Sequence, residues 1–257
     1  MLFETIAVAF AMFSALPVPQ PEWNRRNMRY ALCAFPLIGV VIGGLWWGWS
    51  ALCGALHLPD LLRAAGLCLL PAAVTGGIHL DGYADTCDAL ASHGSPEKRQ
   101  EILKDPRCGA FAIICLCLYF IGDLALCGAV RLDRQALVCM GLAFVLSRTL
   151  SGFAIAAFPL AKNTGLAHTF ATAAHRTRVR WILGAAACLL AAGLCFFGGM
   201  AGAGMTLAAA VMLWWYSRTA RTKFGGISGD LAGWFLQKTE FWMLAVLVLC
   251  QYGEAVL

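Results

Sequence analysis

Apolar residues fill long runs along this chain, and polar residues are confined to the stretches between them. Seven such runs occur, at residues 33–56, 64–80, 109–130, 135–158, 181–198, 202–217 and 239–256. Runs of this length suit helices that cross about 30 Å of hydrocarbon. The fifth and sixth are the least distinct pair, because only Gly198-Gly199 separates them. The pattern predicts an all-α, polytopic membrane helical bundle of about seven transmembrane helices.

The first 16 residues form a shorter apolar stretch that ends before Pro17-Val18-Pro19. It carries Glu4 and lacks the basic start and small-residue cleavage site of a signal peptide. We interpret it as a short N-terminal interfacial helix, and a first membrane span is the alternative.

Composition supports a membrane protein with one domain over residues 1–257. The chain is 60% hydrophobic and 13% charged, whereas soluble domains are about 25% charged. Its twelve cysteines include no Cys-x-x-Cys pair, and most lie in the apolar runs. We therefore expect them to serve as small packing residues rather than as zinc ligands.

Basic residues are strongly biased to one side of the predicted topology. If residues 17–32 are cytosolic and the spans alternate, the cytosolic side receives 15 of the 19 lysines and arginines. This bias predicts a bacterial inner-membrane protein in that orientation. It also accounts for the net charge of +5 without nucleic acid, and anionic membrane lipid is the expected partner of the basic loops. The long polar segments 81–108, 159–180 and 218–238 all become cytosolic and are predicted to form the active site.

Three of the eight aspartates fall in one short segment, at Asp81, Asp85 and Asp88. On a helix this spacing places them within an arc of roughly 60°. Like charges stacked in this way repel one another, and Mg²⁺ held by carboxylates and substrate phosphates would offset the repulsion. A solvated acidic helix face is the alternative.

Two further polar clusters carry cations that suit phosphate. Lys104 and Arg107 directly precede the third span, although a plain surface helix also explains the basic residues just before them. Lys223, Gly225, Gly226 and Asp230 lie together before the last span. The glycines would let backbone N–H groups approach an anion, or they form a tight turn between helices.

Two charged residues fall inside predicted spans, Asp123 and Arg148. Such residues are usually paired or functional. An Asp123–Arg148 pair is one interpretation, and phosphate binding by Arg148 is another.

At this point the sequence resembles the adenosylcobinamide-GDP ribazoletransferase (cobalamin synthase) family. The resemblance rests on Leu16-Pro17-Val18-Pro19, Phe35-Pro36-Leu37-Ile38-Gly39, the segment from Thr75 to Asp88, Asp105-Pro106-Arg107-Cys108-Gly109, Ser147-Arg148, and the segment from Gly225 to Asp230. Ala110-Phe111-Ala112 departs from the family pattern, which commonly has a glycine there, without touching a chemical role.

The resemblance implies that adenosylcobinamide-GDP and α-ribazole, or α-ribazole 5′-phosphate, give adenosylcobalamin, or its 5′-phosphate, and GMP with Mg²⁺. Asp81, Asp85 and Asp88 would hold the metal, which makes Asp85 catalytic. Asp230 would be a further ligand or the general base. Lys104, Arg107, Arg148 and Lys223, with Gly225 and Gly226, would bind substrate. Association with other cobalamin-pathway enzymes is compatible with the cytosolic loops.

Two other functions fit the acidic segment less well. A CDP-alcohol phosphotransferase would have arginine where Thr86 stands and a later pair of spaced aspartates that this chain lacks. A cation transporter would place its carboxylates near the bilayer midplane. Asp81, Asp85 and Asp88 instead follow a span and precede a long polar segment.

Overall fold

The computed structural model describes residues 2–161 and 165–253, which are almost entirely helical. The only β-type pairing in these residues is a single parallel bridge between Leu160 and Ile227. The all-α prediction is therefore confirmed. In order, the helices are α1 (Leu2–Phe13), α2 (Arg25–Met28), α3 (Ala31–Ala34), α4 (Pro36–Ala55), α5 (Asp60–Thr75), α6 (Ile78–Ala91), α7 (Pro96–Ile102), α8 (Ala110–Ala129), α9 (Arg134–Ala157), α10 (Leu166–Ala173), α11 (Arg176–Phe224) and α12 (Gly229–Gly253).

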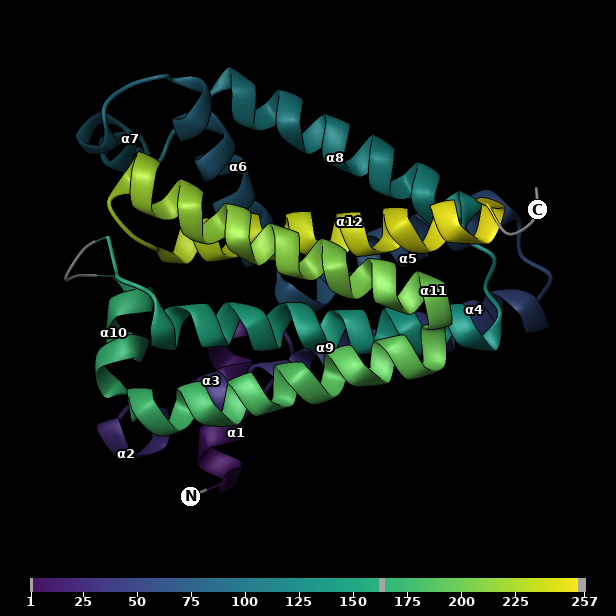
Figure 1. The fold of residues 1–257 in the computed structure, drawn as a ribbon, viewed down its shortest axis with the longest axis horizontal. Helices are drawn as coiled ribbons and strands as arrows, with labels where there is room; N and C mark the ends of the chain where they lie inside the picture. Colours follow the sequence, from purple (N-terminus) through teal and green to yellow (C-terminus); the bar gives the residue numbers. More distant parts are fainter. Residues whose placement is uncertain (1, 162–164, 254–257) are drawn as a thin grey trace.

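The long helices lie side by side along the long axis of the molecule (Figure 1). α9 is central and packs against α4, α11 and α12. One end of the bundle carries α7, α10 and the turn between α11 and α12, and we call it the site end. The other end carries the turns that follow α4 and α8, and we call it the distal end (Figure 1).

Several helices expose large apolar side chains, as expected for helices that face lipid. On α8 these include Phe111, Ile114, Leu118 and Ile121. Five helical segments are long and apolar enough to cross a membrane, and the bent α5–α6 pair is a candidate sixth. The chain is thus an integral membrane protein. The five are Ala31–Ala55, Ala110–Ala129, Arg134–Ala157, Arg176–Phe224 and Gly229–Gly253.

The 49-residue α11 is not one straight helix. Gly199 has φ 53° and ψ −129°, which breaks the helix. The chain reverses there, and the second limb runs back toward the end of the molecule where the first limb began (Figure 1). With the limbs counted separately, each of the seven predicted apolar segments falls on a helix or a bent helix pair.

The second predicted span, residues 64–80, is interrupted rather than continuous. Gly76 and Gly77 both have positive φ, at 63° and 79°, and α6 leaves α5 at an angle of 95°. Glycine adopts this conformation without the steric penalty that other residues meet. The bend brings α6 against α8 and α12 at the site end. α6 itself is not one of the five helices that are long enough to span the membrane.

The predicted loop 218–238 is much shorter in the structure. α11 continues to Phe224 and α12 begins at Gly229, so only residues 225–228 connect them. The last helix therefore begins ten residues before the predicted span. Its first turns are buried by α6, which hydropathy along the chain does not reveal.

The N-terminal stretch forms the twelve-residue helix α1. It packs on α2 and α3 and buries Thr5, Ala7, Val8 and Ala9. At about 1.5 Å per residue, a helix of this length is too short to cross a bilayer.

Candidate functional site

Three aspartates on α6 and one on α12 form the candidate site, and we call these four residues the carboxylate cluster. Asp81, Asp85 and Asp88 all lie within α6, so the predicted helical spacing is confirmed. Asp81 is exposed, whereas Asp85 and Asp88 are half-buried. Asp230 stands in the first turn of α12 and completes the cluster.

Close packing of two helices brings Asp230 to α6. A Cβ atom placed on Gly82 would lie 2.7 Å from the Asp230 Cα atom, so only glycine permits this approach. The α12 N-terminus is capped by Ser228, whose Oγ accepts a hydrogen bond from the Leu231 N–H at 3.2 Å. These contacts hold two segments of chain together although they are far apart in sequence.

The carboxylate cluster concentrates negative charge. The pKa of Asp85 is raised from 3.8 to about 6, mainly by burial and then by the charges of Asp81, Asp230 and Asp88. None of the ion pairs found among residues 2–161 and 165–253 includes Asp81, Asp85 or Asp88. The three α6 carboxylates are therefore available to an external cation.

The donor set fits Mg²⁺ bound together with substrate, rather than a closed metal cage. Every donor in the cluster is a carboxylate oxygen, the ligand type that Mg²⁺ prefers. In the described part of the chain, no three His, Cys, Asp or Glu side chains are arranged as a ready-made metal site. Mg²⁺ commonly uses one or two carboxylates and completes its shell with water and phosphate oxygens.

Two cavities meet at Asp81. One is a groove of about 560 Å³ between the α5–α6 bend, the segment 106–108 and α8, and its lining includes both Asp81 and Asp85. The other is a pocket of about 160 Å³ that is lined by both Asp81 and Asp230. The same carboxylate thus faces two separate spaces that can each hold part of a reacting pair.

The predicted cations Lys104 and Arg107 lie in the connection between α7 and α8, next to the groove. Lys104 is exposed. Arg107 is also exposed and pairs with Asp105 at 2.8 Å, so a ligand would compete with that carboxylate. Just beyond them, Gly109 leaves the space that the Asp88 carboxylate occupies, because a Cβ atom there would overlap it.

The helix α7 is anchored to the end of α11, which places Lys223 at the same end of the molecule. The Gln100 side chain donates to the Phe224 carbonyl at 2.7 Å, and Arg99 donates to the Lys223 carbonyl at 3.4 Å. The Lys223 side chain itself is exposed.

Gly225 and Gly226 form the turn that ends α11. Gly225 has φ 75°, and the Gly226 N–H donates to the Ala220 carbonyl at 3.0 Å. A glycine with positive φ commonly ends a helix in this way. A Cβ atom on Gly226 would lie 2.5 Å from the Leu160 carbonyl carbon, because the 159–161 segment passes against it. The Gly226 amide is engaged within the protein, so the tight-turn interpretation explains these glycines.

Arg148 is buried in the interior of the bundle and is not part of the lining of either cavity at Asp81. It is 1% exposed and pairs with Glu240 at 2.5 Å. The interpretation of an Asp123–Arg148 pair is therefore wrong. Asp123 instead accepts a long contact of 3.9 Å from the Cys127 thiol. The pairing with Glu240 gives Arg148 a role in holding α9 to α12 rather than an open phosphate site.

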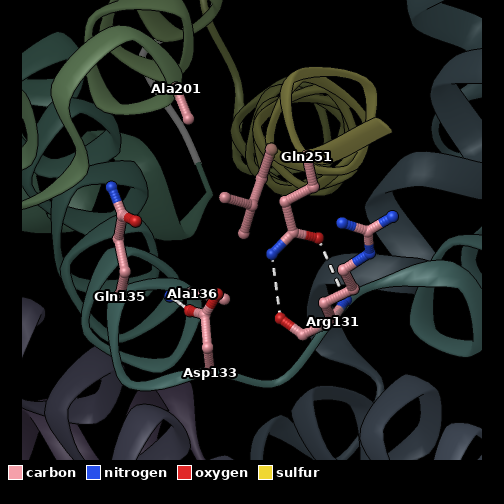
Figure 2. Close-up of a pocket in the computed structure, with 7 residues that line it drawn as sticks. Arg131, Asp133, Gln135, Ala136, Ala201 and Gln251 are labelled. Atoms are coloured by element: carbon pink, nitrogen blue, oxygen red, sulfur yellow. Dashed lines mark hydrogen bonds between the residues drawn. The ribbon is translucent and has the colours of Figure 1, made fainter. Parts of the chain in front are cut away.

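A further cavity of about 290 Å³ lies at the distal end (Figure 2). Its polar groups are used internally. The Gln251 amide donates to the Arg131 carbonyl at 2.8 Å and accepts from the Arg131 N–H at 3.0 Å, and Asp133 caps α9 through the Ala136 N–H at 2.7 Å. Figure 2 shows the Gln251 bonds closing the link between α12 and the α8–α9 turn. The polar groups around this cavity therefore serve to connect helices.

Comparison with known proteins identifies the family of this chain. The sequence matches the family described as cobalamin-5-phosphate synthase over residues 5–248. The chain belongs to this family. No solved structure matches this fold.

Relatives in the family are similar along nearly their whole length. A protein of Lachnoclostridium phytofermentans named adenosylcobinamide-GDP ribazoletransferase is 41% identical over 233 residues, which is 91% of this chain and 88% of the relative. Proteins of the same name from Clostridium perfringens strain SM101 and Pseudomonas fluorescens are 31% and 32% identical. They cover 93% and 91% of this chain, and 95% and 94% of the relatives themselves.

Proposed function

We propose that this protein joins adenosylcobinamide-GDP and α-ribazole, or α-ribazole 5′-phosphate, to give adenosylcobalamin, or its 5′-phosphate, and GMP. The names of the relatives support this reaction. The observation that carries the proposal is the convergence of Asp230 with the three α6 aspartates at the meeting point of two cavities. A two-substrate phosphoryl transfer needs such a junction.

The reaction exchanges one oxygen–phosphorus bond for another. A ribose hydroxyl oxygen of α-ribazole forms a bond to the phosphorus attached to cobinamide. The bond between that phosphorus and the oxygen bridging to the guanylyl phosphate breaks, and GMP leaves with both bonding electrons. The attacking hydroxyl is not the 5′ one if α-ribazole 5′-phosphate is also a substrate, because its 5′ oxygen is already esterified.

The carboxylates divide this work between charge neutralisation and proton transfer. Asp81, Asp85 and Asp88 would hold Mg²⁺, which would neutralise the diphosphate and the leaving phosphate. Asp230 lines the smaller pocket and is the group proposed to take the proton of the attacking hydroxyl. Lys104, Arg107 and Lys223 are proposed to approach non-bridging oxygens. We assign no substrate contact to Arg148, Gly225 or Gly226.

We place the site end in the cytosol of a bacterial cell, with the bundle in the cytoplasmic membrane. The bias of basic residues supports this orientation. The basic segments at that end are suited to contact anionic lipid headgroups and other enzymes of the cobalamin pathway. The lipid phosphotransferase and cation transporter readings are not favoured by the family membership.

The decisive experiment measures GMP release from adenosylcobinamide-GDP by the purified protein in detergent, with and without α-ribazole and Mg²⁺. We expect release that requires both. Asp85→Asn should lower the rate by at least about 100-fold at any Mg²⁺ concentration, because a charged ligand of the metal that neutralises the diphosphate is lost. Asp60→Asn is the matched control, because Asp60 is an exposed carboxylate on α5, at the distal end. Normal turnover by Asp85→Asn would contradict the metal assignment.

A further inference from the structure

The smaller cavity beside Asp81 has walls made of aromatic rings, and we call it the ring pocket. Phe13 contacts Phe35 with ring centroids 4.5 Å apart and Phe170 at 5.2 Å. Phe35 in turn contacts the His79 ring at 5.7 Å. These four residues come from α1, the α3–α4 junction, α10 and α6, and all of them line the pocket. Flat faces that enclose a space select a flat ligand.

The size of the ring pocket limits what it can hold. Its volume is about 160 Å³. An apolar cavity of about 150 Å³ in another protein binds benzene, whereas pockets for larger ligands span about 300–1,000 Å³. The ring pocket thus suits one small aromatic ring system. A corrinoid is far too large for it, and the groove of about 560 Å³ on the other side of Asp81 is the roomier space.

Polar groups occupy only part of the ring-pocket lining. His79 is 7% exposed and lines the pocket, and its Nε2 atom is enclosed without a hydrogen-bond partner. Ser151, Asp81 and Asp230 supply the other polar groups of the lining. A ligand of this pocket therefore combines a largely apolar ring with a polar part that faces these groups.

The mouth of the ring pocket connects it to the carboxylate cluster. Asp81 and Asp230 line the same cavity as the aromatic walls. A ligand whose ring lies among Phe13, Phe35 and Phe170 would therefore extend its polar part toward these two carboxylates.

We propose that the ring pocket is the subsite for the aromatic base of the attacking substrate. This inference rests on the proposed function. The benzimidazole ring of α-ribazole inserts between the phenylalanines, next to the His79 ring. The ribose remains at the mouth, where a hydroxyl reaches Asp230. The diphosphate substrate approaches Asp81 from the groove, so the two substrates meet from opposite sides of α6.

The test compares the Michaelis constants for the two substrates in pocket variants. Phe170→Leu removes one wall, and Ala167→Leu fills the pocket from α10, where Ala167 lines it. Each should raise the KM for α-ribazole by about 10-fold or more while the KM for adenosylcobinamide-GDP stays unchanged.

Phe153→Leu is the matched control. Phe153 is half-buried on α9 and packs against Phe158, with ring centroids 6.3 Å apart, without lining the ring pocket. It should leave both constants unchanged. Thermal unfolding of each variant in detergent identifies any that fail to fold, and Ala167→Leu removes no packing and serves if Phe170→Leu is unstable.

Equilibrium dialysis of α-ribazole alone separates this inference from the proposed function. Saturable binding by the natural protein that weakens in Phe170→Leu and Ala167→Leu, but not in Phe153→Leu, supports the ring pocket without any turnover. If the natural protein makes no GMP, the proposed function fails. A different outcome is that the natural protein makes GMP normally while the pocket variants change the KM values of both substrates equally, or change neither KM. In that case only the ring pocket assignment is overturned.

Discussion

The electrostatics of the carboxylate cluster can be tested at Asp85, because the pKa of this residue is shifted. Burial and the charges of Asp81, Asp230 and Asp88 raise its pKa from 3.8 to about 6. Folding therefore opposes its ionisation, and the protein loses stability as pH rises from about 4 to about 6. Above pH 6 in metal-free buffer, Asp85→Asn should be more stable than the natural protein.

The expected gain is a rise in unfolding temperature of about 2–4 °C, the shift that ~1 kcal/mol gives in a domain of this size, since solvent screens a half-exposed group. The difference should vanish below about pH 4, where the carboxyl is protonated in both states. Mg²⁺ should stabilise the natural protein more than the variant. A variant that is less stable than the natural protein at pH 7 without metal would refute this account of the cluster.

Variants of Arg148 and Glu240 can show whether this buried ion pair stabilises the fold or binds substrate. Arg148→Met leaves the Glu240 carboxylate without its cation in the interior, which should destabilise the protein by about 3–5 kcal/mol. The double variant Arg148→Met with Glu240→Leu should recover most of that loss, because both charges are gone. Ser147 Oγ would keep its bond to the Phe144 carbonyl.

Thermal unfolding and GMP release should be measured on the same preparations of these variants. We expect the stable double variant to remain active, since Arg148 is 1% exposed and lies in the bundle interior. An inactive but well-folded double variant would return Arg148 to the list of phosphate ligands.

At the scale of helices, the sequence predicts which residues share one helix face better than it predicts where a helix is interrupted. The spacing of Asp81, Asp85 and Asp88 requires only a local helix to bring them together, and α6 provides it. The 95° bend before α6 depends on positive φ at Gly76 and Gly77, which a sum of hydropathy cannot register. The glycine pair was visible in the sequence as a break signal inside an apolar run.

The start of α12 shows a second limit of the hydropathy pattern. Its first turns hold Asp230 and Gly233, and Gly233 lies so close to α6 that a Cβ atom would stand 2.7 Å from the His79 carbonyl oxygen. These residues face protein rather than lipid, so they need not be apolar. Asp230 comes close to the α6 aspartates because of this helix packing, and no local sequence pattern indicates it.

At the scale of the whole molecule, the ring pocket is the part of the site that the sequence did not reveal. Phe13, Phe35 and Phe170 lie far apart in the chain and resemble ordinary core residues in their local sequence. They converge only because α1 and α10 close over the same end of the bundle. Charged residues reveal a site through their rarity in an apolar chain, whereas aromatic walls become visible only in three dimensions.

The arrangement of the bundle also fixes which residues share one side of the membrane. Cys108 is exposed in the connection between α7 and α8, at the site end, and Asp60 is exposed in the first turn of α5, at the distal end. In inside-out membrane vesicles, a membrane-impermeant maleimide should label Cys108, and Cys108→Ser should lose that label.

In intact spheroplasts, the double variant Cys108→Ser with Asp60→Cys should be labelled, while the natural protein is not. Cysteines within the spanning helices should stay unreactive, because lipid excludes water and suppresses the thiolate. The reverse pattern would place the carboxylate cluster outside the cell membrane, away from a cytosolic supply of guanylylated substrate, and would contradict the orientation drawn from the basic residues.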